Sequence, residues 1–199
     1  MHQSPSPQRP LVLGSTSRYR RELLERLNLP FEVTAPHVDE TPLPGEAPRA
    51  LALRLALAKA QAVARQHPEA VVVGSDQVAD LAGEALGKPG THERAAAQLA
   101  RMSGQALVFQ TAVAVVAPSL AAIDRAEVRV QMRSLSATEI EAYLRADQPY
   151  DCAGSAKVES LGITLLESVE SDDPTALIGL PLIRTCRLLR RAGLTLPPT

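Results

Sequence analysis

Residues 70–77 read Ala70-Val71-Val72-Val73-Gly74-Ser75-Asp76-Gln77, and this stretch decides the fold. Its continuous run of β-branched residues predicts a buried central strand over residues 70–74. We expect Asp76 just beyond that strand, because polar residues at the carboxyl end of a central strand commonly line the binding crevice of an α/β sheet. There Asp76 can hold Mg²⁺ or accept a proton from an attacking water, or it can bond the backbone of a local turn.

Helical and strand patterns alternate on both sides of this stretch. Strands are predicted over residues 11–14, 31–35, 106–117, 126–135 and 163–166, and helices over residues 18–27, 47–66, 91–102, 136–146 and 182–192. The strands over 106–117 and 126–135 are expected to be antiparallel neighbours. The whole pattern predicts one α/β domain over residues 11–196, with a mixed twisted sheet, flanking helices and two lobes around a cleft.

Composition and charge exclude several classes of protein. The formal net charge is −1 and there is no Trp, so we expect no nucleic-acid polymer as partner, since such binders usually carry a basic excess and stacking aromatics. No run of about eighteen apolar residues is present, which argues against a membrane span. Residues 1–10 are polar and proline-rich, which predicts a disordered tail and no signal peptide. Cys152 and Cys186 are the only cysteines, and reduced, buried thiols suit a cytoplasmic protein.

The segment Ser15-Thr16-Ser17-Arg18-Tyr19-Arg20-Arg21 joins the first predicted strand to the first predicted helix. Such a turn directs backbone N–H groups and the positive end of the helix at a ligand, which suits phosphate. Serine hydroxyls add donors, and an arginine can bridge two phosphate oxygens. The alternative is a Ser17 N-cap on a basic surface helix. The glycine spacing and the lysine of a Walker A loop are absent.

Several single charges are further candidates. Glu40 lies in a proline-flanked loop, Lys59 on the long helix and Lys88 in a glycine-rich turn. Each of them alone is more often a solvated surface charge than a functional group. Small residues in the segment 152–159 permit a close approach of the backbone, and Lys157 and Glu159 would point the same way if that segment is extended.

In their order along the chain these segments resemble the Maf family, from about residue 11 to residue 193. The resemblance is carried by Ser15-Thr16-Ser17-Arg18-Tyr19-Arg20-Arg21-Glu22-Leu23-Leu24, Val38-Asp39-Glu40, Lys59-Ala60, Gly74-Ser75-Asp76-Gln77-Val78, Gly87-Lys88-Pro89, Cys152-Ala153-Gly154-Ser155 and Gly179-Leu180-Pro181-Leu182. It implies the fold of Maf and inosine triphosphatase-like proteins, with a nucleotide cleft between the lobes. It also implies hydrolysis of a nucleoside triphosphate to the monophosphate and pyrophosphate with a divalent cation, Mg²⁺ or Mn²⁺.

The resemblance further implies a role for each candidate residue. Asp76 is the catalytic carboxylate and serves the metal and the water together with Glu40. Phosphate is held by Ser15, Ser17 and Arg20, and its charge is neutralised by Lys59 and Lys88. This combination is coherent because hydrolysis at a phosphoryl centre depends mostly on positioning and on stabilising charge. A homodimer is expected by resemblance only.

Within the family, the chain is similar to the YceF-like subgroup, which is associated with 7-methyl-GTP. The specificity positions are Tyr19, Gln77 and Glu159, where the subgroup that acts on dTTP and UTP has Arg, Thr and Gln. A 7-methylguanine ring is positively charged, so an aromatic face and a carboxylate both favour it. Glu159 can also accept hydrogen bonds from the guanine N1–H and exocyclic amine. The chain departs from the usual pattern at Arg18, where the family has proline, and at Tyr19, where the subgroup has Trp.

Three alternatives remain at this point. The first is the same chemistry on dTTP and UTP, the second is a nucleotide-binding regulator of septum formation, and the third is a phosphate-binding module with structural carboxylates. The joint presence of Glu40, Lys59, Asp76 and Lys88 favours catalysis, because a pure binder would not need the full set.

Overall fold

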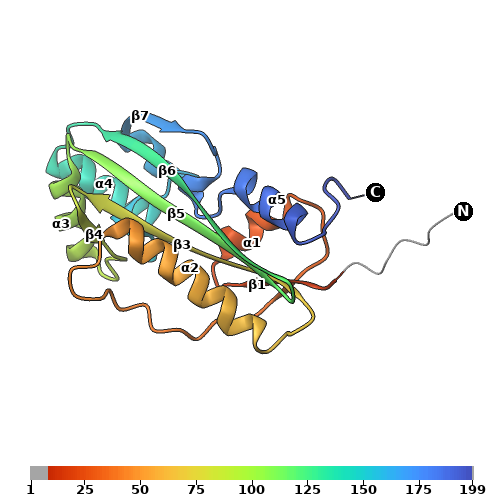
Figure 1. The fold of residues 1–199 in the computed structure, drawn as a ribbon. Coiled ribbons are helices and arrows are strands. Elements are labelled where there is room, and N and C mark those ends of the chain that lie inside the picture. The colour runs from red at the N-terminus through yellow and green to blue at the C-terminus, as the bar shows by residue number, and fades with distance from the viewer. Residues whose placement is uncertain (1–8, 199) are drawn as a thin grey trace, which may run out of the picture.

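A computed structural model describes residues 9–198 of the chain and shows an α/β fold (Figure 1). The strands are β1 (Leu11–Gly14), β2 (Glu32–Val33), β3 (Val71–Leu81), β4 (Glu84–Leu86), β5 (Ala106–Ala117), β6 (Leu120–Met132) and β7 (Leu166–Ser171). The helices are α1 (Arg18–Glu25), α2 (Pro48–Ala64), α3 (His92–Met102), α4 (Ala137–Asp147) and α5 (Leu182–Arg191), with short 3-10 helices η1 (Ala153–Ser155), η2 (Leu161–Leu165) and η3 (Ala176–Ile178). Of the predicted tail over residues 1–10, residues 1–8 lie outside the described residues, and the Pro10 carbonyl accepts a hydrogen bond from the Val71 N–H at 2.8 Å.

The strands form one mixed sheet, in the order β2-β1-β3-β5-β6-β7, with β4 paired to β3. β1 runs parallel to both β2 and β3, whereas β3, β5, β6 and β7 run antiparallel to one another in turn. The predicted fold class is therefore confirmed, and so is the antiparallel pairing of β5 and β6. The N-caps of α3 and α4 are Thr91 and Ser136, the first residues of the two predicted helices, and the second forms a full capping box.

Four predicted strands have different bounds in the structure, and the one predicted over residues 31–35 is shortened to Glu32–Val33. β3 continues to Leu81, so the expectation that Asp76 lies beyond a strand ending at Gly74 is wrong, because the ladder with β5 runs unbroken from Val72 to Asp80. The predicted strand over residues 163–166 is also wrong: η2 occupies it, and the sheet pairing with β6 begins only at Leu166. The strand predicted over residues 126–135 begins earlier, at Leu120, and ends at Met132.

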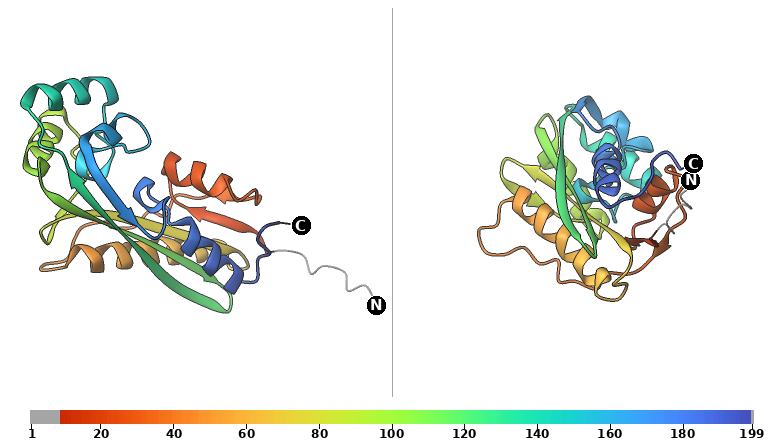
Figure 2. Two further views of the ribbon diagram at one scale, coloured as in Figure 1. Left: turned by 90° about the horizontal axis from the view of Figure 1, so that it is seen from above. Right: turned by 45° about the vertical axis from the view of Figure 1, so that its right-hand side comes forward.

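The helices are distributed unequally over the two faces of the sheet, and two separate groups of helices on one face form two lobes. α2 packs on one face, against Val72 and Val78 of β3. On the opposite face, α1 and α5 pack around Val71 and Val73, and α3 and α4 pack around Ala79 and its neighbours farther along β3. Side chains two apart on a strand share a face, so both helix groups lie on the same side, at opposite ends of the long strands (Figure 2).

One edge of β3 has an opening between its two short neighbours. β1 pairs with β3 as far as Gly74, and β4 pairs with it only from Ala79 onward. Within residues 9–198, positions 75–78 have no strand on that edge. The opening lies where β1 ends and its chain turns into α1, so it combines the carboxyl end of a parallel strand with the N-terminus of a helix.

Gly74 brings α2 against the sheet at this opening. A Cβ at position 74 would lie 2.5 Å from both the Ala56 carbonyl oxygen and the Ala60 nitrogen, so only glycine permits this approach. The approach places Lys59 of α2 next to β3. Among residues 9–198, no helix combines the length and the apolar character that crossing a membrane requires.

Candidate active site

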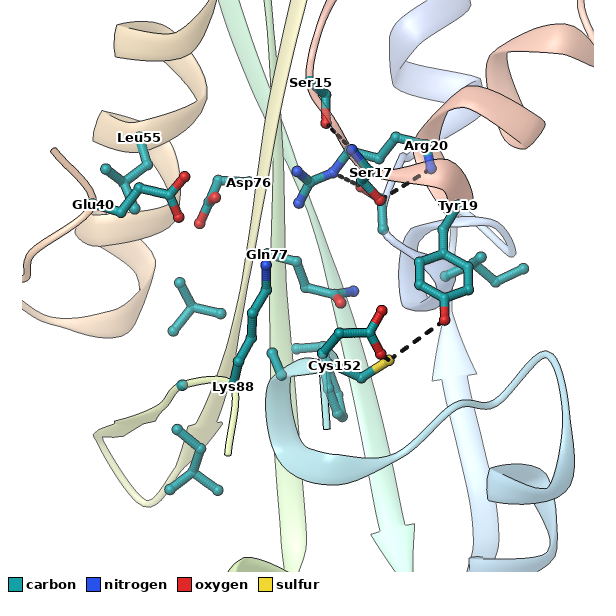
Figure 3. A pocket seen from close by; sticks show the side chains of 18 of the residues that line it. Ser15, Ser17, Tyr19, Arg20, Glu40, Leu55, Asp76, Gln77, Lys88 and Cys152 are labelled. Carbon is teal, nitrogen blue, oxygen red and sulfur yellow. Dashed lines mark hydrogen bonds between the residues drawn. The ribbon is translucent and has the colours of Figure 1, made fainter. Parts of the chain in front are cut away.

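A cavity of about 580 Å³ lies at the opening beside β3, between the two lobes. It is lined by every residue to which the resemblance gives a role: Ser15, Ser17, Tyr19, Arg20, Glu40, Lys59, Asp76, Gln77, Lys88 and Glu159. These residues come from segments far apart in the chain, and Figure 3 shows most of them around one space. The structure thus brings the predicted site together, while the role of each residue stays a prediction.

Lys59 and two carboxylates form the charged centre of this pocket. The Lys59 ammonium lies 2.6 Å from Asp76 Oδ1 and 2.9 Å from Glu40 Oε1. The Lys59 and Asp76 side chains are buried, with 5% and 9% of their surface exposed, whereas Glu40 is 55% exposed. Lys59 is therefore no solvated surface lysine. Its single ammonium contacts both carboxylates and offsets part of their mutual repulsion.

The free atoms of this centre face the cavity. Asp76 Oδ2 accepts no hydrogen bond from residues 9–198, and no buried polar side-chain atom among those residues lacks a partner, so Oδ2 is accessible. It is the atom that can take a proton or bind a cation. Burial acts to raise the pKa of Glu40, but the hydrogen bond and charge of Lys59, with Lys88 and Arg20, outweigh it and lower that pKa. Glu40 is therefore held as a carboxylate.

Arg20 is anchored through one nitrogen and leaves the rest of its guanidinium free. Its Nε donates to the Gly179 carbonyl at 2.9 Å, and that carbonyl lies 3.1 Å from the Ser75 hydroxyl. No residue of the described part of the chain accepts from its two terminal nitrogens, which are left for a ligand. Burial lowers the pKa of Arg20, and the nearby carboxylates of Asp76 and Glu40 oppose that shift.

The turn between β1 and α1 supplies the serine hydroxyls. Ser15 Oγ accepts from the Ser17 N–H at 3.2 Å, and Ser17 Oγ accepts from the Arg20 N–H at 3.4 Å (Figure 3). Ser17 is therefore the N-cap of α1, as the alternative interpretation held, and it also lines the cavity. Ser15 is buried, with 4% of its surface exposed. A hydroxyl that bonds locally can still donate its own proton to a ligand.

Tyr19 forms a second part of the pocket with Arg18 and Cys152. An Arg18 terminal nitrogen donates to the Tyr19 hydroxyl at 2.7 Å, and the guanidinium carbon lies 4.7 Å from the centre of the ring. The Cys152 thiol lies 3.9 Å from the same hydroxyl. Burial raises the pKa of Tyr19 to about 12, although the Arg18 hydrogen bond opposes it. Tyr19 thus presents a neutral ring, and both cysteines are free thiols that are only partly buried.

Glu159 lines the cavity, but its segment is not extended. The Lys157 carbonyl accepts from the N–H groups of Ser160 and Gly162, so the chain turns back at this point. The Lys157 ammonium donates to the Asp147 carbonyl at 2.8 Å, at the end of α4, and Lys157 does not line the cavity. The expectation that Lys157 and Glu159 point the same way therefore fails. Partial burial raises the pKa of the Glu159 carboxyl.

The sequence did not point to two groups that organise the pocket. The Gly179 carbonyl holds Arg20, and the buried Thr111 hydroxyl lies 3.0 Å from the Gln77 side-chain nitrogen. In the sequence Gly179 belongs to the Gly179-Leu180-Pro181-Leu182 motif, but its residue type does not reveal that its backbone carbonyl binds a side chain. A polar Gln110-Thr111 pair inside an otherwise apolar strand was the one available sign for Thr111.

Comparison with known proteins agrees with this geometry. Residues 10–192 match the family described as Maf-like protein. A protein from Polaromonas sp. named 7-methyl-GTP pyrophosphatase is 70% identical over 190 residues, which are 94% of this chain and 87% of that protein. Proteins of the same name from Albidiferax ferrireducens and Xanthomonas campestris pv. campestris are 65% and 59% identical, over 94% of this chain and 95% and 98% of their own lengths. Since the match covers nearly the whole sequence, this chain belongs to the Maf family.

Proposed function

We propose that this protein hydrolyses a nucleoside triphosphate to the monophosphate and pyrophosphate, with 7-methyl-GTP as its preferred substrate. The observation that carries the proposal is the pocket in which Lys59 bridges Asp76 and Glu40, with Arg20 and Lys88 on the same cavity. Carboxylates for water or metal and cations for phosphate are the groups that phosphoryl hydrolysis requires. The relatives named 7-methyl-GTP pyrophosphatase support the choice of substrate.

The reaction uses water as the nucleophile. Water attacks the α-phosphorus, a new P–O bond forms, the bond from that phosphorus to the α–β bridging oxygen breaks, and pyrophosphate leaves with the bridging oxygen. Asp76 Oδ2, the accessible oxygen of a carboxylate whose other oxygen is held by Lys59, takes the proton of the water or binds the cation. Arg20, Lys59 and Lys88 stabilise the negative charge of the phosphates.

A divalent cation, Mg²⁺ or Mn²⁺, fits the donor set of the pocket. Within residues 9–198 no group of three or more His, Cys, Asp or Glu side chains could hold a metal ion alone. Mg²⁺ is usually bound through one or two carboxylates together with substrate phosphates. Glu40 and Asp76 are two such carboxylates on one ammonium, and they would hold the cation together with the triphosphate. When bound, the cation supplies charge neutralisation for the phosphates.

We propose that the base lies against Tyr19, Gln77 and Glu159, which line the same cavity. A 7-methylguanine ring is cationic, so it gains from the Tyr19 ring and from the Glu159 carboxylate. An uncharged guanine gains less from both groups. The cytoplasmic location and the homodimer that the resemblance implies remain predictions.

One assay tests the proposal: release of pyrophosphate from 7-methyl-GTP, GTP, dTTP and UTP, each with Mg²⁺ or Mn²⁺. The highest kcat/KM is expected for 7-methyl-GTP. A preference for dTTP and UTP would contradict 7-methyl-GTP as the preferred substrate, but it would still support hydrolysis to the monophosphate and pyrophosphate. Tight nucleotide binding without pyrophosphate release would contradict the chemistry and favour a nucleotide-binding regulator, such as one of septum formation.

A further inference from the structure

The Gln77 side chain is held by three acceptors on the wall of the pocket. Its amide nitrogen lies 3.0 Å from Thr111 Oγ1, 2.9 Å from the Ala176 carbonyl oxygen and 3.0 Å from the Leu177 carbonyl oxygen. A backbone carbonyl can only accept a hydrogen bond. The NH₂ group must therefore face η3, because the reversed amide would place its oxygen against two other oxygens.

Thr111 joins this arrangement to the sheet. It is fully buried on β5, directly opposite Gln77 in the register of β3 and β5. Its hydroxyl proton is donated to the Ala176 carbonyl at 2.9 Å, so its oxygen is available to Gln77 only as an acceptor. The Thr111 hydroxyl of β5 therefore donates to η3 and accepts from the Gln77 amide, and these two directions cannot be exchanged.

The Gln77 oxygen is the atom left for the ligand. Gln77 lines the cavity, and its side chain reaches into the space between Asp76 and Cys152 in Figure 3. No residue among those described donates a hydrogen bond to its Oε1. An amide oxygen accepts and does not donate, so the edge of the base that meets it must carry an N–H group.

We infer that Thr111 is a positioning residue for base selection, which holds Gln77 so that the pocket offers the base an acceptor and no donor at this point. Guanine has two N–H groups on the relevant edge, at N1 and at the exocyclic amine. Adenine has a bare ring nitrogen at N1 and is rejected there, because two acceptors face each other. The identity of the base rests on the proposed function, whereas the orientation of Gln77 does not.

The test compares kcat/KM for 7-methyl-GTP and 7-methyl-ATP in the wild type, Thr111→Val and Thr111→Ser. Both bases carry a methylated, cationic ring, so the ratio of the two values reports the hydrogen-bonding edge. Thr111→Val should lower this ratio about two- to tenfold, the effect of one hydrogen bond, and Thr111→Ser should keep it. An unchanged ratio in a folded Thr111→Val protein, with all substrates affected equally, would make Thr111 merely structural and overturn the inference.

A second variant tests the orientation without any substrate and also covers the case in which Thr111→Val does not fold. Gln77→Glu has the same shape but puts a carboxylate against the Ala176 and Leu177 carbonyls, which raises the pKa of the new carboxyl. Its Tm should lie farther below that of the wild type at pH 8 than at pH 5, where the protonated carboxyl can donate. The other charged groups of the pocket (Arg18, Arg20, Glu40, Lys59, Asp76, Lys88, Asp151 and Glu159) are common to both proteins. A pH-independent difference would overturn the orientation even if 7-methyl-GTP proves to be the substrate.

Discussion

Lys59 is the residue that connects the charged groups of the pocket, because its ammonium contacts both Asp76 and Glu40. A buried charge is tolerated when it is paired, and here the Lys59 ammonium pairs with the buried Asp76 and with the more exposed Glu40. Arg20 and Lys88 then add positive charge on the side where a triphosphate would lie. The pocket is therefore prepared for an anionic ligand although the whole chain has a net charge of −1.

Asp76→Asn tests the catalytic carboxylate. The amide keeps the shape of the side chain and can still accept from Lys59, but it cannot take a proton from water, so kcat should fall on the order of a hundredfold or more. The matched control is Asp80→Asn, which changes a carboxylate on the same strand whose oxygen accepts from the Gly83 N–H outside the cavity. Turnover within a few-fold of the wild type in a folded Asp76→Asn protein would remove Asp76 from the chemistry.

Glu159→Gln tests recognition of the cationic base. The change removes charge and keeps size, so kcat/KM for 7-methyl-GTP should fall about two- to tenfold while that for GTP and UTP stays near the wild-type value. Because burial raises the pKa of Glu159, the wild-type preference for the methylated base should decline as the pH falls toward that raised pKa, whereas the variant should show no such dependence. An equal loss for all three substrates with a lower Tm would assign Glu159 a structural role.

β3 is the element that creates the site. It is shared between β1 and β4 on one edge, and the interval between them exposes Asp76 and Gln77 to the cavity. Its two faces carry side chains with different contacts: Asp76 points toward α2 and Lys59, and Gln77 points toward Thr111 of β5 and toward η3. Asp76, which we propose as the catalytic carboxylate, thus lies inside a central strand, at a place where residues 9–198 supply no neighbouring strand on one edge.

Gly74→Ala tests how closely α2 must approach β3. The added Cβ meets α2 backbone atoms at 2.5 Å, so the helix must shift and carry Lys59 away from Asp76. We expect a loss of about 1–3 kcal/mol in the free energy of unfolding, from overpacking, together with a lower kcat. Gly87→Ala is the control for stability, since a Cβ there meets nothing within 4 Å. Equal melting temperatures for the two variants would contradict the close-packing argument.

The sequence predicted the order of elements and the pocket residues better than it predicted where strands end. Capping residues such as Thr91 and Ser136 are local signals, and the structure has both caps. The end of β3 is not local, because the ladder with β5 carries the strand through the polar residues Ser75 to Gln77. Residues 163–166 are apolar in sequence, but hydrogen bonds to Lys157 and within η2 compete with the sheet. The contact of Thr111 with Gln77 depends on the register of β3 and β5, which the residue types alone do not give.

The whole molecule places two helix groups at opposite ends of one face, with the cavity between them (Figure 2). A ligand in that cavity contacts both lobes, since α1 supplies Tyr19 and Arg20 on one side and the region around η1 supplies Cys152 and Ala153 on the other. Ligand binding should therefore stabilise the folded chain as a unit. A ligand at a hundred times its Kd contributes about 2.7 kcal/mol to the free energy of unfolding.

Because binding raises the Tm, thermal melting can distinguish the stabilisation by the cation from the stabilisation by the nucleotide. In the wild type the Lys59 ammonium already occupies the place between the two carboxylates, so Mn²⁺ alone should raise the Tm little, and Mn²⁺ with a non-hydrolysable triphosphate should raise it much more. Lys59→Met removes the ammonium that contacts both Asp76 and Glu40, which should lower the Tm in the absence of metal. Mn²⁺ alone should then restore much of that loss, because it replaces the missing positive charge.

Lys157→Met is the matched control for this last prediction, since the Lys157 ammonium bonds the end of α4 outside the cavity. Its removal can lower the Tm, but Mn²⁺ should shift that Tm no more than it shifts the wild type. The comparison therefore isolates the carboxylate pair from general effects of losing a lysine. Equal Mn²⁺ shifts in the wild type, Lys59→Met and Lys157→Met would show that Asp76 and Glu40 do not hold the cation, and the metal would then have to bind through the triphosphate alone.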